Sequence, residues 1–115
     1  MKTIDHEQIT MLIEGAGIEA VRPILEAYWE SNDELKASIA AAIESGSPSD
    51  IAATAHGLKG SSANLGAVLV ASRALEIELA AKAGDISAAQ DAYAKLDEDI
   101  DATREAFNEI LSEAA

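Results

Sequence analysis

Residues 18–43, IEAVRPILEAYWESNDELKASIAAAI, carry the clearest structural signal in the chain. Apolar residues recur in this stretch at alternating steps of three and four, which is the spacing of one buried face of an α-helix. One polar residue, Asn32, lies within the stripe, which otherwise consists of Ile18, Val21, Leu25, Tyr28, Leu35, Ile39 and Ile43. The stretch therefore predicts a long helix. Pro23 is compatible with it only near its start, so we also expect irregularity or a kink over residues 19–23.

A second stripe with the same spacing lies near the C-terminus and predicts one further long helix. It consists of Ile86, Ala89, Tyr93, Leu96, Ile100, Thr103, Phe107 and Ile110. Between the two stripes, three short segments carry the glycine that typically follows a helix and the serine or aspartate that typically precedes one. These segments are residues 45–49 (SGSPS), 65–66 (LG) and 83–85 (AGD).

The turn segments divide the middle of the chain into helices at about residues 48–65 and 67–83, and a shorter helix is expected over residues 5–14. Short connections place consecutive helices side by side and antiparallel. The sequence thus predicts an all-α fold, an antiparallel up-and-down four-helix bundle with a short additional N-terminal helix. At 115 residues, of which 49% are hydrophobic, residues 1–115 are expected to form a single domain.

The charge and composition argue against several classes of partner. The net charge is −13 with only 8 lysine and arginine residues, so neither nucleic acid nor an anionic membrane is an expected partner. The chain has no cysteine, and no apolar run reaches the length of a membrane span. The N-terminal residues also lack the apolar region of a secretion signal. We therefore expect a cytoplasmic protein.

Residues 55–62, AHGLKGSS, depart from the composition of a stable helix because they contain two glycines. Each glycine costs roughly 1 kcal/mol relative to alanine inside a helix. A helical projection places Ile51, Ala55, Leu58, Ser62 and Leu65 on the core side, so His56 points away from the core. The residues expected around His56 on the surface are all small, and we predict that they form the face at which a partner docks: Ala52, Ala53, Gly60 and Ala63.

The position of His56 suits phosphoryl chemistry. A solvated imidazole is largely uncharged near neutral pH, so a ring nitrogen can attack an activated phosphoryl group without a dedicated base. Lys59 lies one helical turn further on and could offset the negative charge of the phosphoryl oxygens. The sequence contains no phosphate-binding loop or nucleotide-binding fingerprint, so the activating groups must come from a partner.

Residues 55–67, AHGLKGSSANLGA, closely resemble the signature of histidine-containing phosphotransfer (HPt) domains, His-x-Leu-Lys-Gly-Ser-(Ser or Ala)-x-x-Leu-Gly-Ala. The flanking helices are also similar, so the resemblance covers nearly the whole chain. It implies a four-helix phosphorelay intermediate on which His56 is the phosphoacceptor, Lys59 steadies the phosphoryl group and Gly60 gives the partner room to approach. Several family members carry a glutamine that orients the histidine ring, and the spacing places Glu78 at that position.

The resemblance also implies the partners of the chain. These are response-regulator receiver domains and a hybrid histidine kinase, with the Mg²⁺ of the reaction bound by the receiver. We expect no cofactor and no metal site on the chain itself, no autonomous kinase or phosphatase activity, and a monomer. Two alternatives remain open at this point. The chain could be a helical adaptor that regulates a receiver or kinase by occupancy, or the dimerisation and phosphoacceptor domain of a sensor kinase.

Other polar residues receive structural interpretations. His6 is expected to be an ordinary surface residue, and Ser61 and Ser62 are expected to allow close helix packing rather than to act as nucleophiles. The acidic residues at positions 97–99 and 101 are interpreted as a solvated face, because no loop brings them together around a cation. Residues 67–83 carry two apolar stripes, and one of the two is expected to be partly exposed, as a docking area or a weak self-association face. The stripes consist of Val70, Ala74, Ile77 and Ala81, and of Val68, Leu75 and Leu79.

Overall fold

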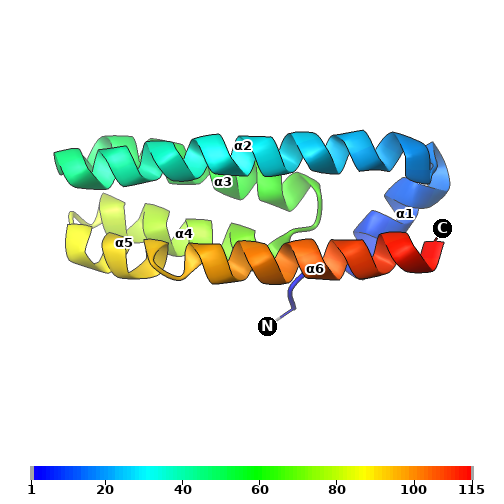
Figure 1. The fold of residues 1–115 in the computed structure, drawn as a ribbon. Coiled ribbons are helices and arrows are strands. Elements are labelled where there is room, and N and C mark those ends of the chain that lie inside the picture. The colour runs from blue at the N-terminus through cyan, green and yellow to red at the C-terminus, as the bar shows by residue number, and fades with distance from the viewer. Residues whose placement is uncertain (1, 115) are drawn as a thin grey trace.

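Helices joined by short turns make up the computed structural model, which describes residues 2–114 (Figure 1). No strand occurs within those residues, and the all-α bundle expected from the sequence is confirmed. In chain order the helices are α1 (His6–Ala16), α2 (Ile18–Ser45), α3 (Pro48–Asn64), α4 (Val68–Lys82), α5 (Ile86–Tyr93) and α6 (Leu96–Ala114).

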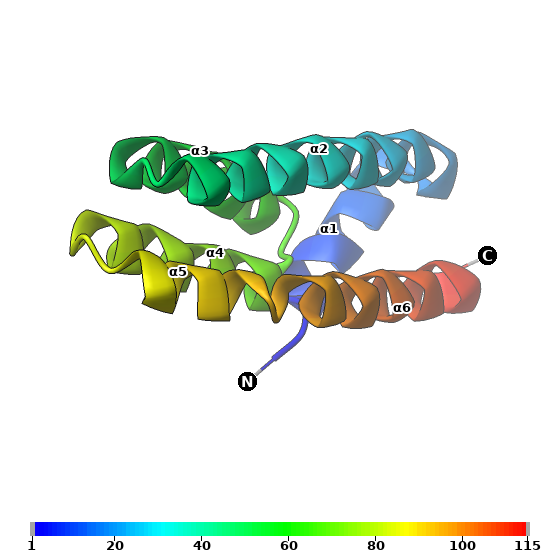
Figure 2. The same ribbon diagram turned by 60° about the vertical axis from the view of Figure 1, so that its left-hand side comes forward.

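The helices differ in length, and this difference determines the architecture. Helix α2 has 28 residues, and α5 and α6 follow one another along the opposite edge of the bundle (Figures 1 and 2). Helices α3 and α4, with 17 and 15 residues, form a shorter hairpin that covers only part of this length. Helix α1 packs at the end of the bundle that α3 and α4 do not reach, where it contacts α2. The additional N-terminal helix thus takes the place of the missing ends of α3 and α4.

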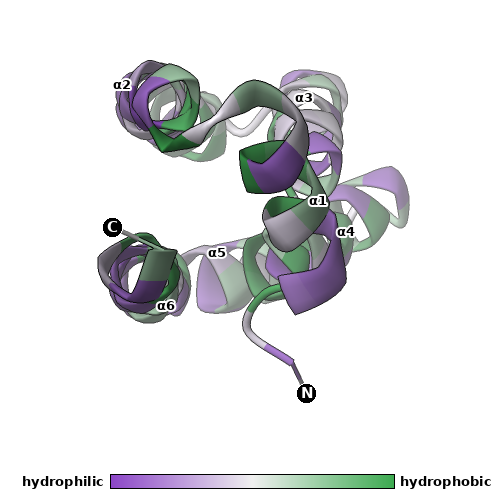
Figure 3. Ribbon diagram, turned by 90° about the vertical axis from the view of Figure 1, so that its right-hand side faces the viewer, coloured by the Kyte–Doolittle hydropathy of each residue, from purple (hydrophilic) through white to green (hydrophobic). Residues whose placement is uncertain are grey.

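The core consists of two clusters of buried side chains along the bundle axis. The first joins the C-terminal half of α2 to α3, α4, α5 and the start of α6. The second joins α1, the N-terminal half of α2 and the C-terminal half of α6. Trp29 packs against both clusters. An end-on view shows the apolar sides of the helices turned toward one another (Figure 3). Burial of these stripes is the main force that holds the helices together.

The predicted turn chemistry accounts for the helix boundaries around α3. Gly46 adopts a left-handed conformation (φ +69°) at the end of α2, and Pro48 occupies the first turn of α3. The Ser47 hydroxyl accepts a hydrogen bond from the backbone N–H of Asp50. Helix α2 begins at Ile18 and is continuous through Pro23, so it is not interrupted over residues 19–23, where irregularity or a kink was expected. The chain turns just before α2, at Gly17 (φ +89°).

The C-terminal stripe does not form one helix, which corrects the prediction for residues 86–110. A turn at Ala94 and Lys95 separates α5 from α6, and the Lys95 N–H bonds to the Ala92 carbonyl three residues back. The Ala94 backbone remains in the right-handed helical region (φ −61°, ψ −20°), so α6 continues in the direction of α5. The apolar stripe therefore still faces the core on both sides of the turn.

The N-terminal segment is fastened to the turn between α3 and α4. The Asp5 N–H donates to the Gly66 carbonyl at 2.7 Å, and the Gln8 side chain donates to the Asn64 carbonyl at 2.8 Å. Gly66 has a φ of +74°, and a Cβ atom at this position would lie 3.2 Å from Asp5 Cβ. Only glycine satisfies both the left-handed backbone and this close approach. The turn at the end of the HPt-like motif is therefore held by Asp5 and by Gln8 of α1.

Candidate functional site

His56 lies midway along α3 and points out of the bundle. Its side chain is 66% exposed, whereas Ala55 and Leu58, on either side of it in the core stripe, are fully buried. The helical projection therefore assigned the two faces of α3 correctly. An imidazole in this position can be reached by another protein without any movement of the bundle.

Glu78 on α4 holds one side of the His56 ring. Its Oε2 atom lies 2.9 Å from Nδ1 of His56, and its Oε1 atom lies 2.8 Å from Nζ of Lys59. The Glu78 side chain is only 3% exposed, so the carboxylate approaches the ring from the side of the core. The contact that the spacing suggested is thus present, and it depends on the packing of α4 against α3.

The charge on Glu78 determines which ring nitrogen carries the proton. The ammonium of Lys59 lowers the pKa of the Glu78 carboxyl to about 2, against the opposing effect of burial and with smaller contributions from Lys82 and His56. An ionised carboxylate can only accept hydrogen bonds. Nδ1 of His56 therefore donates its hydrogen to Glu78, and Nε2 of the neutral ring keeps its lone pair on the outward side.

Lys59 is less free than the sequence suggested. Its side chain is 31% exposed, and its ammonium is paired with Glu78 rather than extended into solvent. A second cation, Lys82 on α4, lies 3.2 Å from Glu78 Oε2. Two lysines and the imidazole thus share one carboxylate, an arrangement that sequence reasoning missed for Lys82. The spacing of four residues between Glu78 and Lys82 on one helix is the signal that could have indicated it.

The small residues around His56 are exposed with one exception. Ala53, Gly60 and Ala63 are exposed, and a Cβ atom added to Gly60 would meet nothing within 4 Å. Ala52 is only 8% exposed and belongs to the first core cluster, so its predicted place on the accessible face is wrong. It lies two turns before Lys59 on the same side of α3, the side from which Lys59 reaches Glu78 of α4.

Comparison with protein families and solved structures agrees with this geometry. The Hpt domain family model matches residues 23–106, which is more than half of the sequence. The chain belongs to the Hpt domain family. Its structure is also similar to the crystal structure of histidine-containing phosphotransfer protein B (HptB) from Pseudomonas aeruginosa PAO1, with a TM-score of 0.87 and 25% sequence identity. That match covers 98% of this chain and 97% of HptB. Comparison with curated protein sequences gave no match.

Membership of the family establishes the general function. This Hpt domain is a phosphorelay protein, a histidine phosphotransfer carrier that works with receiver domains and histidine kinases. Within residues 2–114, no helix is both long and apolar enough to cross a membrane. The same part of the chain contains no group of three or more histidine and acidic side chains that could hold a metal ion.

The serines of the motif have the structural roles that the sequence predicted. Ser62 is fully buried, and its hydroxyl oxygen lies 2.6 Å from the hydroxyl of Tyr28 on α2. The Ser61 hydroxyl donates to the Leu58 carbonyl one turn earlier in α3. Both hydroxyls are therefore occupied within the Hpt domain. Through its contact with Tyr28, Ser62 also connects α3, the helix that contains His56, with α2.

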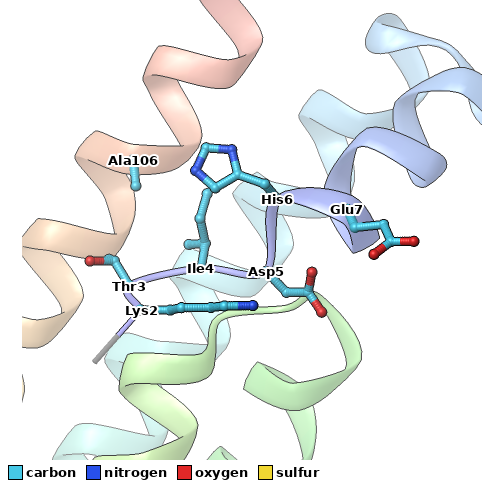
Figure 4. Close-up of a pocket in the computed structure, with 7 residues that line it drawn as sticks. All are labelled: Lys2, Thr3, Ile4, Asp5, His6, Glu7 and Ala106. Carbon is cyan, nitrogen blue, oxygen red and sulfur yellow. The ribbon is translucent and has the colours of Figure 1, made fainter.

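A hollow lies at the N-terminal end of the Hpt domain (Figure 4), and the other histidine is among the residues that line it. Its volume is about 490 Å³, and His6 is exposed at its rim. The other lining residues are Lys2, Thr3, Ile4, Asp5, Glu7 and Ala106. None of them lies in α3 or α4. His6 makes no contact resembling the one between His56 and Glu78 among the described residues, so we place the functional site at His56 and not at this hollow.

The acidic cluster at the start of α6 is not uniformly solvated, which corrects one part of the prediction. Asp99 is buried, and its Oδ2 atom accepts a hydrogen bond from Nε of Arg73 at 2.6 Å. Asp97 pairs with Lys36 of α2. Glu98 and Asp101 are exposed as expected. The ion pairs reach α4 and α2, respectively, so part of this cluster fastens α6 to its neighbours.

The two apolar stripes of α4 are separated as expected. Val70, Ala74, Ile77 and Ala81 are buried, whereas Leu75 and Leu79 are exposed. The two exposed leucines flank the position of Glu78 along the helix. Two large apolar side chains of α4 are therefore exposed close along the helix to Glu78, which contacts His56.

Proposed function

We propose that His56 is the phosphoacceptor and that Nε2 is its reacting atom. The observation that carries this proposal is the 2.9 Å contact between Nδ1 and the buried carboxylate of Glu78. Because Nδ1 carries the hydrogen, the Nε2 lone pair is directed away from the bundle. Glu78 acts as a positioning residue that fixes the ring orientation and the tautomer.

The transfer step balances without a proton leaving the ring. The Nε2 lone pair attacks the phosphorus of an aspartyl phosphate on a receiver domain. The P–O bond breaks, and its electron pair returns to the aspartate as a carboxylate. The product is an N-phosphorylated imidazolium that keeps its hydrogen on Nδ1, and the carboxylate of Glu78 offsets the new positive charge. Transfer to a second receiver reverses the step.

The receiver contributes the remaining chemistry. We place the Mg²⁺ of the reaction and the groups that stabilise the transferred phosphoryl group on the receiver. The Hpt domain presents an accessible face at Ala53, Gly60 and Ala63, with Lys59 beside the ring. On this proposal the protein is a carrier without kinase or phosphatase activity of its own, and it acts as a monomer. A cytoplasmic location is also part of the proposal.

Phosphotransfer from a labelled receiver tests the site. Wild type and His6→Gln should take up label, and His56→Gln should take up none. Label on His56→Gln at the wild-type level would refute the assignment. Acid-labile, base-stable phosphate on the wild type would also exclude an adaptor that acts by occupancy alone. Sedimentation of the purified protein tests the monomer and the alternative of a dimerising kinase domain.

A further inference from the structure

One short stretch near the N-terminus contacts both helices that build the site. Nε2 of Gln8 donates hydrogen bonds to two carbonyls at the C-terminal end of α3, those of Ala63 at 3.2 Å and Asn64 at 2.8 Å. In the first turn of α4, the backbone N–H of Leu69 donates to the Thr3 carbonyl at 3.1 Å. The end of α3 and the start of α4 are therefore tied to the same segment of chain.

These contacts act at helix ends, where the backbone has polar groups to spare. The last carbonyls and the first N–H groups of a helix lie outside its regular hydrogen bonds. Helix α4 has no side-chain cap at its N-terminus, where the N-cap residue is Ala67. The Thr3 carbonyl supplies an acceptor there, and the Gln8 amide supplies donors at the end of α3. We call residues 3–8 the clamp.

The clamp is anchored in the core and fits the turn between α3 and α4 closely. Ile4 is only 2% exposed and belongs to the second core cluster. Asp5 lies beside the turn (Figure 4), and its N–H donates to the Gly66 carbonyl at 2.7 Å. A Cβ atom on Gly66 would lie 3.3 Å from Oε1 of Gln8. The clamp therefore cannot shift without moving the turn.

The clamped ends lie a short distance along each helix from the site. His56 precedes Ala63 by about two turns of α3, and Glu78 follows Leu69 by about two and a half turns of α4. A helix is stiff over this distance, so a shift at its end is carried to the site. The contact between Nδ1 of His56 and Oε2 of Glu78 is 2.9 Å long, and it is lost once the two atoms separate beyond about 3.5 Å.

We propose that Gln8 is a positioning residue for phosphotransfer: its hydrogen bonds to the end of α3 fix α3 against α4 and thereby keep His56 in contact with Glu78. Gln8 acts through the helix and touches neither the imidazole nor the phosphoryl group. The proposal rests on His56 being the phosphoacceptor.

Labelling by phosphoramidate, a small phosphodonor, measures the reactivity of His56 without any partner protein. Gln8→Met keeps the length of the side chain but has no hydrogen to donate, and Gln90→Met makes the same change at an exposed position of α5. We expect Gln8→Met to slow labelling by about three- to tenfold, less than the loss of the orienting carboxylate itself. Gln8→Lys, whose ammonium can donate to the same carbonyls, should recover most of the rate. Gln90→Met should equal wild type.

The ¹⁵N shifts of the His56 imidazole separate positioning from a merely structural role. The two ring nitrogens have distinct shifts while Glu78 holds one tautomer, and these shifts should move toward each other in Gln8→Met. Thermal unfolding midpoints report the stability of each variant. A lowered midpoint of Gln8→Met with wild-type ¹⁵N shifts and a wild-type labelling rate would leave Gln8 a structural contact and overturn the proposal.

Gly66→Ala disturbs the clamp independently of Gln8. Its Cβ atom would press on Asp5 and Gln8, whereas Gly84→Ala places a Cβ atom at a similar backbone φ with nothing within 4 Å. We expect the ¹⁵N shifts of His56 to change in Gly66→Ala and to stay at their wild-type values in Gly84→Ala. Unchanged shifts in both Gly66→Ala and Gln8→Met would overturn the clamp alone. Absence of label on the wild type would overturn the assignment of His56 and this proposal together.

Discussion

Nδ1 of His56 on α3 lies 2.9 Å from Oε2 of Glu78 on α4, so the orientation of the exposed ring is set by a neighbouring helix. The contact joins a solvated side chain to a buried one. Any change that moves α4 along α3 must therefore alter the orientation of the His56 ring, even where it leaves α3 itself intact. This dependence leads to the first prediction.

Substitution of Glu78 should separate its hydrogen bond from its charge. In Glu78→Gln the amide oxygen can still accept from Nδ1, so the tautomer should be kept. In Glu78→Leu no acceptor remains, and we expect transfer to fall by about 10- to 100-fold, the usual cost of losing such an orienting partner. The ¹⁵N shifts of the imidazole report the tautomer. A leucine variant with the wild-type tautomer and transfer rate would contradict the role of Glu78.

The lowered pKa of Glu78 predicts a specific dependence of stability on pH. The carboxyl pKa is about 2 in the folded protein and about 4.5 in a free side chain, so its ionised form stabilises the fold above pH 4.5. This contribution should be lost as the pH falls from about 4.5 toward 2. Urea unfolding of wild type and Glu78→Gln measures it, and the difference between the two proteins should shrink over that range. A difference that stays constant with pH would argue against the ion pairs.

Gly60 should matter for the approach of a partner and not for folding. An added Cβ atom meets nothing within 4 Å, so Gly60→Ala should raise the free energy of unfolding by about 0.5–1 kcal/mol through helix propensity. Gly60→Gln should remain folded but slow transfer from a receiver by at least about tenfold, because it displaces the docked partner. Labelling by phosphoramidate should stay unchanged. Equal receiver transfer in wild type and Gly60→Gln would remove the steric argument.

Gly66 and Gly84 form a matched pair for testing the turn at the end of the motif. Both adopt a left-handed backbone, with φ of +74° and +75°, but only Gly66 would place a Cβ atom against Asp5. Gly84→Ala should cost about 1 kcal/mol of unfolding free energy for the backbone alone. Gly66→Ala should cost roughly 1–2 kcal/mol more, because the N-terminal segment must move. Denaturant unfolding measures both, and equal losses would show that the contact with Asp5 is unimportant.

Particular residues show which features of the fold and the site could be predicted from the sequence and which could not. The stripes around Val21 and Phe107 specified long helices because helical periodicity is a local property of the chain. The projection of α3 likewise placed His56 outside and Leu58 inside. It failed for Ala52, because whether a residue at the edge of a stripe is covered depends on how closely α4 packs. Sequence patterns along single helices also could not reveal the pairing of Asp99 with Arg73, because these two residues lie on different helices.

The sequence by itself determined the all-α class, the exposed histidine and the family motif, because each follows from spacing along one segment of chain. Tertiary structure decided what surrounds the ring. Glu78 is 22 residues from His56 in sequence, and Lys82 follows it by one turn of α4. Only the packing of α4 on α3 brings their charges to the imidazole, since electrostatic interactions depend on distance in space and burial rather than on separation along the chain.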